Sequence, residues 1–225
     1  MQISACIFDL DGVIVDTAKF HYLAWKRLTD QLGIHFTAED NERLKGVSRM
    51  ASLEIILEIG NKNIDESLKQ EYATLKNKWY IDYISKMTPD DLLPGCRKFI
   101  NELRKADIRT AIGSASKNTP MILERVGILN LFDAVADGNI VSKAKPDPEV
   151  FIKAAEMVGV KPANCIVFED AVAGVQAALN AGMVCIGIGS PRILTEAHYV
   201  VPGLNMMNIT KLMSIKKKSG YEQFL

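Results

Sequence analysis

The sequence lacks an excess of charge of either sign, a long apolar run and any closely spaced pair of cysteines. Its 225 residues carry 27 Lys and Arg against 27 Asp and Glu, so the formal net charge is zero. This balance argues against a nucleic acid or a membrane surface held by bulk charge. No apolar run is long enough to cross a bilayer. The first strand-like segment begins at Ile3, which leaves no room for a signal peptide, so we expect a cytoplasmic protein.

The cysteines form no metal-binding pair such as C-x-x-C. They are Cys6, Cys96, Cys165 and Cys185, and three of them lie in apolar, strand-like segments. We expect them to act as small buried hydrophobes in a reducing compartment.

Hydrophobic residues make up 48% of the chain, which is ordinary for a globular protein. Short apolar, β-branched segments alternate with segments of helical periodicity, a pattern typical of a parallel sheet with helices on both faces. The expected strands are 3–8, 108–113, 133–136, 165–168, 184–187 and 199–201.

One part of the chain interrupts this alternation. After the first strand, roughly 70 residues show helical spacing and no strand signal. Helices are expected over 18–32, 50–59 and 64–87, and Thr37-x-x-Asp40 resembles a helix start. We therefore predict a doubly wound, Rossmann-like α/β core formed by residues 1–16 and 89–225, with an inserted small α-helical cap domain at residues 17–88.

The first strand stops at Asp9-Leu10-Asp11-Gly12. Residues two apart in an extended chain point to the same side, so Asp9 and Asp11 can face one site. Ligands of an open α/β sheet bind beyond the carboxyl ends of its strands. Two close carboxylates repel each other unless a cation or a proton separates them, which favours Mg²⁺. A plain Asp-Gly turn is the alternative that this motif alone leaves open.

Acidic residues also follow the strand at 165–168. Glu169 and Asp170 could complete an oxygen shell for Mg²⁺. Alternatively, Asp170 could cap the helix that begins next. Because Asp9 and Asp11 lie at another strand end, the metal site is the stronger reading of the acidic pair.

A hydroxyl-rich segment follows the strand at 108–113. Ser114 and residues 115–118 precede a helix that we expect to begin at Pro120, with Thr119 as its cap. Hydroxyls, backbone N–H groups and a helix N-terminus suit a phosphate, although simple capping by solvated serines is an alternative.

Lys145 stands before Pro146-Asp147-Pro148. A lysine near a phosphate offsets negative charge that accumulates in a transition state. An exposed lysine before a turn is the alternative, and Lys143 is a nearby rival for the same role.

These segments, in this order, resemble the motifs of the haloacid dehalogenase-like phosphotransferases, and the resemblance covers nearly the whole chain. They are Asp9-x-Asp11-Gly12-Val13-x-x-Asp16-Thr17, the segment at Ser114, Lys145-Pro146 and Glu169-Asp170. The resemblance implies that Asp9 is a nucleophile that forms an aspartyl-phosphate and that Asp11 is a general acid–base. It also implies that Ser114 and Lys145 hold the non-transferring phosphoryl oxygens.

The resemblance also implies a cofactor. Mg²⁺ would be bound by Asp9, the backbone carbonyl of Asp11, Glu169 and Asp170.

Two groups in the insert carry further chemistry. The first is His21 and Trp25, which are four residues apart and share one helical face. The second is the segment Leu44-Lys45-Gly46-Val47-Ser48-Arg49. Its glycine lets a ligand approach the backbone closely, and a lysine and an arginine flank that glycine. The alternatives are a core tryptophan with a surface histidine, and a plain loop between helices. Both groups resemble the cap of phosphosugar mutases in the family, in which they read the sugar phosphate. The resemblance assigns to substrate binding Thr17, His21, Trp25, Lys45, Gly46, Val47, Arg49, Ser52, Lys76, Ala115, Ser116, Lys117 and Asn118.

The reaction implied by this resemblance converts β-glucose 1-phosphate to glucose 6-phosphate through the 1,6-bisphosphate, under a cap that excludes water. The expected partners are small-molecule sugar phosphates, with no nucleic acid and no membrane, and the expected state is a monomer. Three alternatives stay open: a sugar-phosphate phosphatase with the same core, a phosphosugar-binding module without catalysis, and a phosphonatase in which Lys45 forms a Schiff base. The presence of Asp9 and Asp11 disfavours the binding module.

Overall fold

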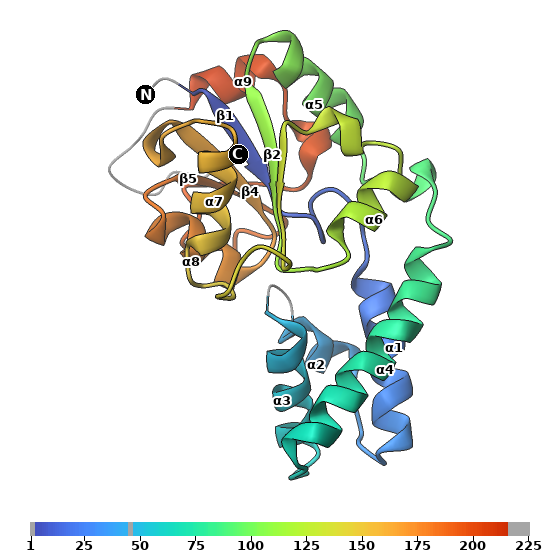
Figure 1. Ribbon diagram of the computed structural model, residues 1–225. Coiled ribbons are helices and arrows are strands. Elements are labelled where there is room, and N and C mark those ends of the chain that lie inside the picture. Colours follow the sequence, from blue (N-terminus) through green and yellow to red (C-terminus); the bar gives the residue numbers. More distant parts are fainter. Residues whose placement is uncertain (1–2, 45–46, 216–225) are drawn as a thin grey trace.

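A parallel sheet forms the centre of the computed structural model, which describes residues 3–44 and 47–215 (Figure 1). Within those residues the sheet has six strands in the order β3-β2-β1-β4-β5-β6. The strands are β1 (Ala5–Phe8), β2 (Arg109–Gly113), β3 (Ala134–Ala136), β4 (Cys165–Glu169), β5 (Val184–Ile188) and β6 (Tyr199–Val201). Every neighbouring pair is parallel, so the predicted doubly wound core is confirmed.

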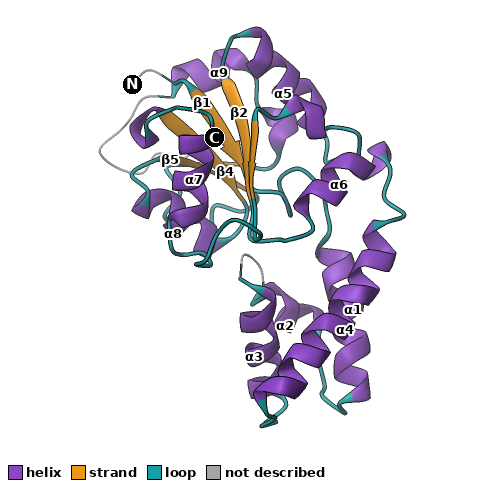
Figure 2. Cartoon of the chain, viewed as in Figure 1, coloured by secondary structure: helices purple, strands orange, loops and turns teal. Residues whose placement is uncertain are grey.

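Helices cover both faces of this sheet, as Figure 2 shows. They are α5 (Cys96–Lys105), α6 (Thr119–Arg125), α7 (Glu149–Met157), α8 (Val172–Asn180) and α9 (Ile209–Ser214), with short 3₁₀ turns at Pro89–Asp91, Leu129–Leu131, Pro162–Asn164 and Leu204–Met206. Alternate strand residues belong to two separate cores, because successive side chains of a strand point to opposite faces. Phe8 and Phe168 lie in the core that includes Phe99 of α5, whereas Ile7 and Val167 lie in the core of α7 and α8.

Aromatic rings lock β1 against β4 just below the strand ends. The Phe8 ring stacks on Phe168 with centroids 4.8 Å apart, and it meets Phe99 and Phe132 edge-on at 6.3 and 6.2 Å. All four side chains are buried. The residues that follow β1 and β4 therefore start from a rigid base.

In the described residues of the insert, 17–44 and 47–88, four helices lie together beside the strand ends, below the sheet in Figure 1. They are α1 (Ala18–Gln31), α2 (Ala38–Glu42), α3 (Arg49–Ile59) and α4 (Glu66–Ile84). Thr37 and Asp40 form the capping box that the sequence suggested, with each side chain accepting the other residue's backbone N–H. We keep the name cap for residues 17–88.

Two linkers join the cap to the core, and they run side by side. The Leu93 N–H donates to the Ile14 carbonyl at 2.9 Å, and Val15 pairs with Leu92 in an antiparallel bridge. The Gly12 N–H donates to the Val15 carbonyl at 2.7 Å and closes the turn after β1. The domain boundaries at residues 16/17 and 88/89 stay a prediction.

One local expectation is wrong. Helix α6 begins at Thr119 with Asn118 as its N-cap, so Thr119 does not cap it. The Thr119 hydroxyl instead donates to the Ser116 carbonyl at 2.8 Å.

The four cysteines are buried with free thiols, as expected. Of the helices in the described residues, none has both the length and the apolar character that a membrane span requires.

We expect Phe8→Ala to lower the free energy of unfolding by about 3–5 kcal/mol, since it opens a cavity among four packed rings. Phe20→Ala is the matched control, because Phe20 is only partly buried and stacks on Tyr83 within the cap at 6.3 Å. Urea denaturation of both variants measures the difference. Equal losses for the two variants would contradict the role given to the ring cluster.

Candidate active site

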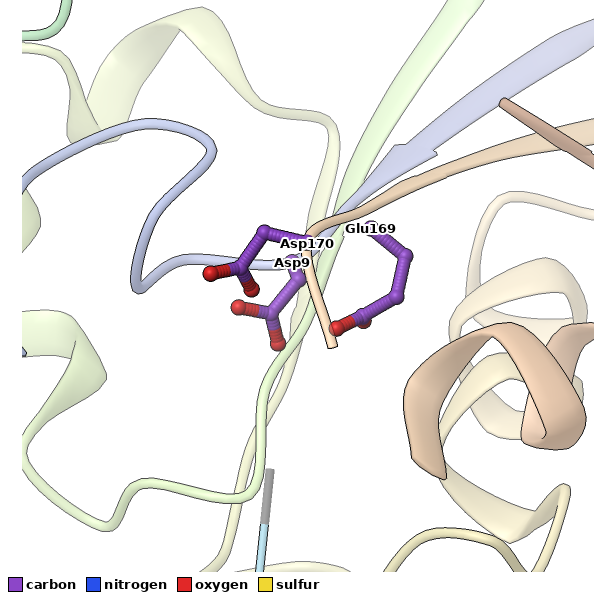
Figure 3. Close-up of side chains that lie close together, drawn as sticks. All are labelled: Asp9, Glu169 and Asp170. Carbon is purple, nitrogen blue, oxygen red and sulfur yellow. The ribbon is translucent and has the colours of Figure 1, made fainter. Parts of the chain in front are cut away.

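The sheet brings two acidic strand ends together. The strand order reverses between β1 and β4, and in a doubly wound sheet this switch point opens a crevice at the carboxyl ends. Phe8 is in register with Phe168, so Asp9 emerges beside Glu169 and Asp170. Figure 3 shows the three carboxyl groups close together, and one oxygen from each lies within 4.8 Å of the others. These are ligands that a hard divalent cation prefers, so the donor set fits Mg²⁺.

Lys145 lies buried between two of these carboxylates. Its ammonium donates to Asp9 Oδ1 and, at 2.8 Å, to Glu169 Oε2. Burial opposes the charged form, but the negative charges of Asp9 and Glu169 raise the pKa of Lys145 above its ordinary value. The rival Lys143 is exposed and pairs with Asp147 at 3.3 Å. The geometry therefore favours Lys145 as the cation of the site.

Glu169 is held from two further sides. Its second oxygen accepts the Ala171 N–H at 3.0 Å, and a Cβ built on Gly174 of α8 would lie 2.0 Å from its carboxyl carbon. Burial first, and then the charge of Asp9, raise the pKa of Glu169. In Figure 3 the carboxyl groups of Asp9 and Asp170 lie near each other, and the Glu169 side chain curves back so that its carboxyl group approaches Asp9 from the other side.

Gly12 makes room for Asp170. Its φ of 81° lies in the left-handed region, and a Cβ at this position would lie 2.0 Å from Asp170 Oδ2. Helix α8 has Ala171 as its N-cap residue, so Asp170 is not the N-cap. The glycine thus serves both the turn and the acidic cluster.

Asp11 has surroundings that suit proton transfer. The Thr17 hydroxyl donates to its Oδ1. Burial first, and then the nearby charge of Asp9, raise the pKa of Asp11 to about 7. A carboxyl group with a pKa near neutrality can both give and take a proton at physiological pH.

Residues 114–118, which we call the Ser114 loop, lie on the core side of the cavity. Ser114 is buried, and its hydroxyl accepts the Ser116 N–H at 3.2 Å. The Ser116 hydroxyl in turn accepts the Asn118 N–H at 3.2 Å. The serine side chains therefore shape the loop as well as face the cavity.

The cap contributes a basic wall. Lys76 is buried, its ammonium lies 2.9 Å from His21 Nδ1, and it faces the rings of Trp25 and Tyr80 at 4.6 and 4.7 Å. Burial and the nearby Arg49 lower the pKa of Lys76 well below its ordinary value. Burial, then Lys76 and Arg49, likewise lower the pKa of His21. Such a wall gains stability when an anion enters the cavity.

Core and cap residues line one cavity of about 450 Å³. The predicted site residues among its lining are Asp9, Asp11, His21, Trp25, Val47, Arg49, Ser52, Lys76, Ser114, Ala115, Ser116, Lys117, Asn118, Glu169 and Asp170. Thr17 and Lys145 are not part of the lining. The Thr17 hydroxyl donates a hydrogen bond to Asp11, and the Lys145 ammonium donates one to Asp9. Lys45 and Gly46 lie outside the described residues. The phosphonatase alternative depends on a Schiff base at Lys45, so it also falls outside them.

Some lining residues were not anticipated. Asn77 of α4, and Ser142 and Ala144 before Lys145, also face the cavity. Their only sequence signal is adjacency to Lys76 and Lys145, which is weak by itself. Glu149 was missed as well, because its importance depends on how the loop before it folds.

Glu149 anchors the loop that carries Lys145. Its carboxylate accepts the N–H groups of Ser142 and Lys143 at 2.9 and 2.7 Å, and it pairs with Lys153 at 3.1 Å. The backbone N–H of Lys143 first, and then Lys153, lower the pKa of Glu149 to about 2. This anchor fixes the segment from which Lys145 enters the core.

Comparison with known proteins gives consistent matches. Residues 3–182 match the haloacid dehalogenase-like hydrolase family model. The chain is 45% identical over 199 residues to the β-phosphoglucomutase of Bacillus subtilis (strain 168), with 88% of each chain covered. It is 29% identical over 182 residues to a phosphorylated carbohydrates phosphatase of Thermotoga maritima, covering 80% of this chain and 82% of that one. The crystal structure of β-phosphoglucomutase from Clostridium difficile matches with a TM-score of 0.91 at 41% identity, covering 94% and 96% of the two chains.

The Glu149 anchor predicts a pH dependence of stability. Because folding lowers this pKa, the ionised carboxylate stabilises the fold above its ordinary pKa of 4.5, and this contribution is lost as the pH falls toward 2. Wild type should therefore exceed Glu149→Gln in free energy of unfolding near neutral pH, and the two should converge in acid. Glu58→Gln, at an exposed position of α3, should follow wild type throughout. A difference between wild type and Glu149→Gln that does not change with pH would contradict the anchor.

Proposed function

The chain belongs to the haloacid dehalogenase-like hydrolase family, and from that premise we propose that it is a Mg²⁺-dependent β-phosphoglucomutase. It interconverts β-glucose 1-phosphate and glucose 6-phosphate through a 1,6-bisphosphate. The observation that carries the proposal is the cavity in which a basic cap wall faces the acidic strand ends. The similarity to β-phosphoglucomutases over most of the chain supports it. We further propose that it works as a cytoplasmic monomer on free sugar phosphates.

Asp9 acts as the nucleophile of the proposed reaction. Its carboxylate attacks phosphorus, the bond from phosphorus to the sugar oxygen breaks, and an aspartyl-phosphate forms. Asp11 gives a proton to the departing sugar oxygen and takes one from the sugar hydroxyl that attacks next, in keeping with its raised pKa. Lys145 and Ser114 hold the other phosphoryl oxygens. Asp9, the Asp11 carbonyl, Glu169 and Asp170 would hold Mg²⁺, which supplies positive charge to the phosphoryl group.

The cap residues favour a mutase over a phosphatase. A mutase must hold one phosphate of the bisphosphate while the other reacts, so it needs a second anion site away from the strand ends. Arg49 and Lys76 face the cavity from the cap and provide such a site. The same core would serve a sugar-phosphate phosphatase, in which water accepts the phosphoryl group, and the Thermotoga maritima relative keeps this alternative open.

Phosphorus NMR of the wild-type reaction distinguishes the two functions. With β-glucose 1-phosphate, Mg²⁺ and a trace of the 1,6-bisphosphate, glucose 6-phosphate should accumulate much faster than inorganic phosphate. Asp9→Asn should retain the fold and lose turnover, because the amide is nearly isosteric but a poor nucleophile. Inorganic phosphate as the main wild-type product would establish the phosphatase instead.

Asp170→Ala should raise the Mg²⁺ concentration needed for half-maximal activity by about tenfold or more, because one carboxylate of a hard-cation site is removed. Titration of activity with Mg²⁺ measures this shift. Asp82→Ala, at an exposed position of α4, is the control and should leave the titration unchanged. Full activity of wild type in the presence of a chelator would argue against the metal site.

Arg49→Ala should impair isomerisation far more than hydrolysis of a small aryl phosphate, because the aryl substrate has no second phosphate for the cap to hold. Arg49→Lys should recover only part of the loss, since lysine lacks the planar fork that matches phosphate. Arg43→Ala, an exposed residue that follows α2, should behave as wild type. Parallel losses in the two activities would remove Arg49 from the second anion site.

A further inference from the structure

The cap and the core share a hydrogen bond across the cavity. The Asn118 side-chain amide, at the end of the Ser114 loop, donates to Asn77 Oδ1 of α4 at 3.0 Å. Both residues line the cavity. They are 41 positions apart in the sequence and belong to different parts of the molecule, so this contact forms only when the cap stands in its present position.

The core side of this contact is already braced. The Asn118 N–H is held by Ser116, and the Lys117 carbonyl accepts from Asn139 Nδ2 at 3.0 Å. Asn118 is also the N-cap of α6. The Ser114 loop is therefore held by hydrogen bonds within the core, and the contact with Asn77 adds one hydrogen bond from the cap to this loop.

The cap side of the contact is coupled to the basic wall. Asn77 follows Lys76 on α4, and neighbouring residues of a helix point about 100° apart. Lys76 accordingly lies against His21 and Trp25 on the cap side of the cavity, while Asn77 reaches the core. One turn of α4 thus positions the anion-binding wall and contacts the Ser114 loop.

We propose that Asn77 is a positioning residue that fastens the cap to the Ser114 loop through Asn118 and so keeps water from the aspartyl-phosphate. This inference rests on the proposed function. Water that reaches the site attacks phosphorus, the bond from phosphorus to Asp9 breaks, and inorganic phosphate and the free carboxylate result. A fastened cap leaves the sugar hydroxyl as the acceptor.

The first test compares Asn77→Ala, Asn118→Ala and the double variant in the full chain. Phosphorus NMR gives the ratio of inorganic phosphate to glucose 6-phosphate for each. Asn77→Ala should raise this ratio about three- to tenfold, the effect of one net hydrogen bond on the balance of open and fastened states. The double variant should not exceed Asn118→Ala, because both substitutions remove the same contact. Asn63→Ala, an exposed asparagine that precedes α4, should match wild type.

Aryl phosphate hydrolysis separates this role from a general structural one, since that substrate needs only the core. The proposal requires that Asn77→Ala keep this activity while its product ratio rises. An unchanged ratio overturns the proposal, and so does a parallel loss of aryl phosphate hydrolysis.

Hydrogen exchange of the substrate-free protein gives a second readout that needs no sugar turnover. Amides of residues 114–118 should exchange faster in Asn77→Ala than in wild type or Asn63→Ala. If wild type makes no glucose 6-phosphate, the mutase proposal fails and exchange alone decides the role of Asn77. Equal exchange in Asn77→Ala and wild type overturns the inference.

Discussion

The buried ammonium of Lys145 between Asp9 and Glu169 is the interaction on which the rest of the site depends. Parallel strands deliver three carboxyl groups to one edge, and such crowding is unfavourable unless positive charge lies among them. A buried charge left without its partner costs several kcal/mol, roughly 3–5 in measured cases. This arrangement depends on three further residues. Gly12 and Gly174 leave space for the side chains of Asp170 and Glu169, and Glu149 holds the loop that carries Lys145.

The sequence predicted the strand ends well for a physical reason. A strand buried on both faces is a continuous apolar run, and its polar successors mark the edge at which ligands bind. Asp9, Ser114 and Glu169 were located in this way. The choice of Lys145 over Lys143 needed the resemblance, because both lysines precede the same turn and only the folded loop separates a buried one from an exposed one.

The remaining features depend on contacts between distant segments. Asn77 is a half-buried polar residue in a long, polar-rich helix, and nothing in helical periodicity separates it from an exposed polar neighbour such as Lys78. Thr119 was assigned as a cap because threonine often caps helices, whereas here its hydroxyl bonds back to Ser116 and the helix starts one residue earlier. Glu149 has the same limitation, since its partners belong to an irregular loop.

The paired linkers bear on how such proteins diversify. Leu93 bonds to Ile14, so the two ends of the insert leave the core as neighbours whatever lies between them. The entropy of closing a loop grows only with the logarithm of its length, about 0.6 kcal/mol for each doubling, so the core is nearly indifferent to the size of the insert. Changes in the length of the insert therefore need little adjustment of the core sheet. A change in the length or sequence of the cap can therefore alter one wall of the cavity and leave the acidic strand ends in place.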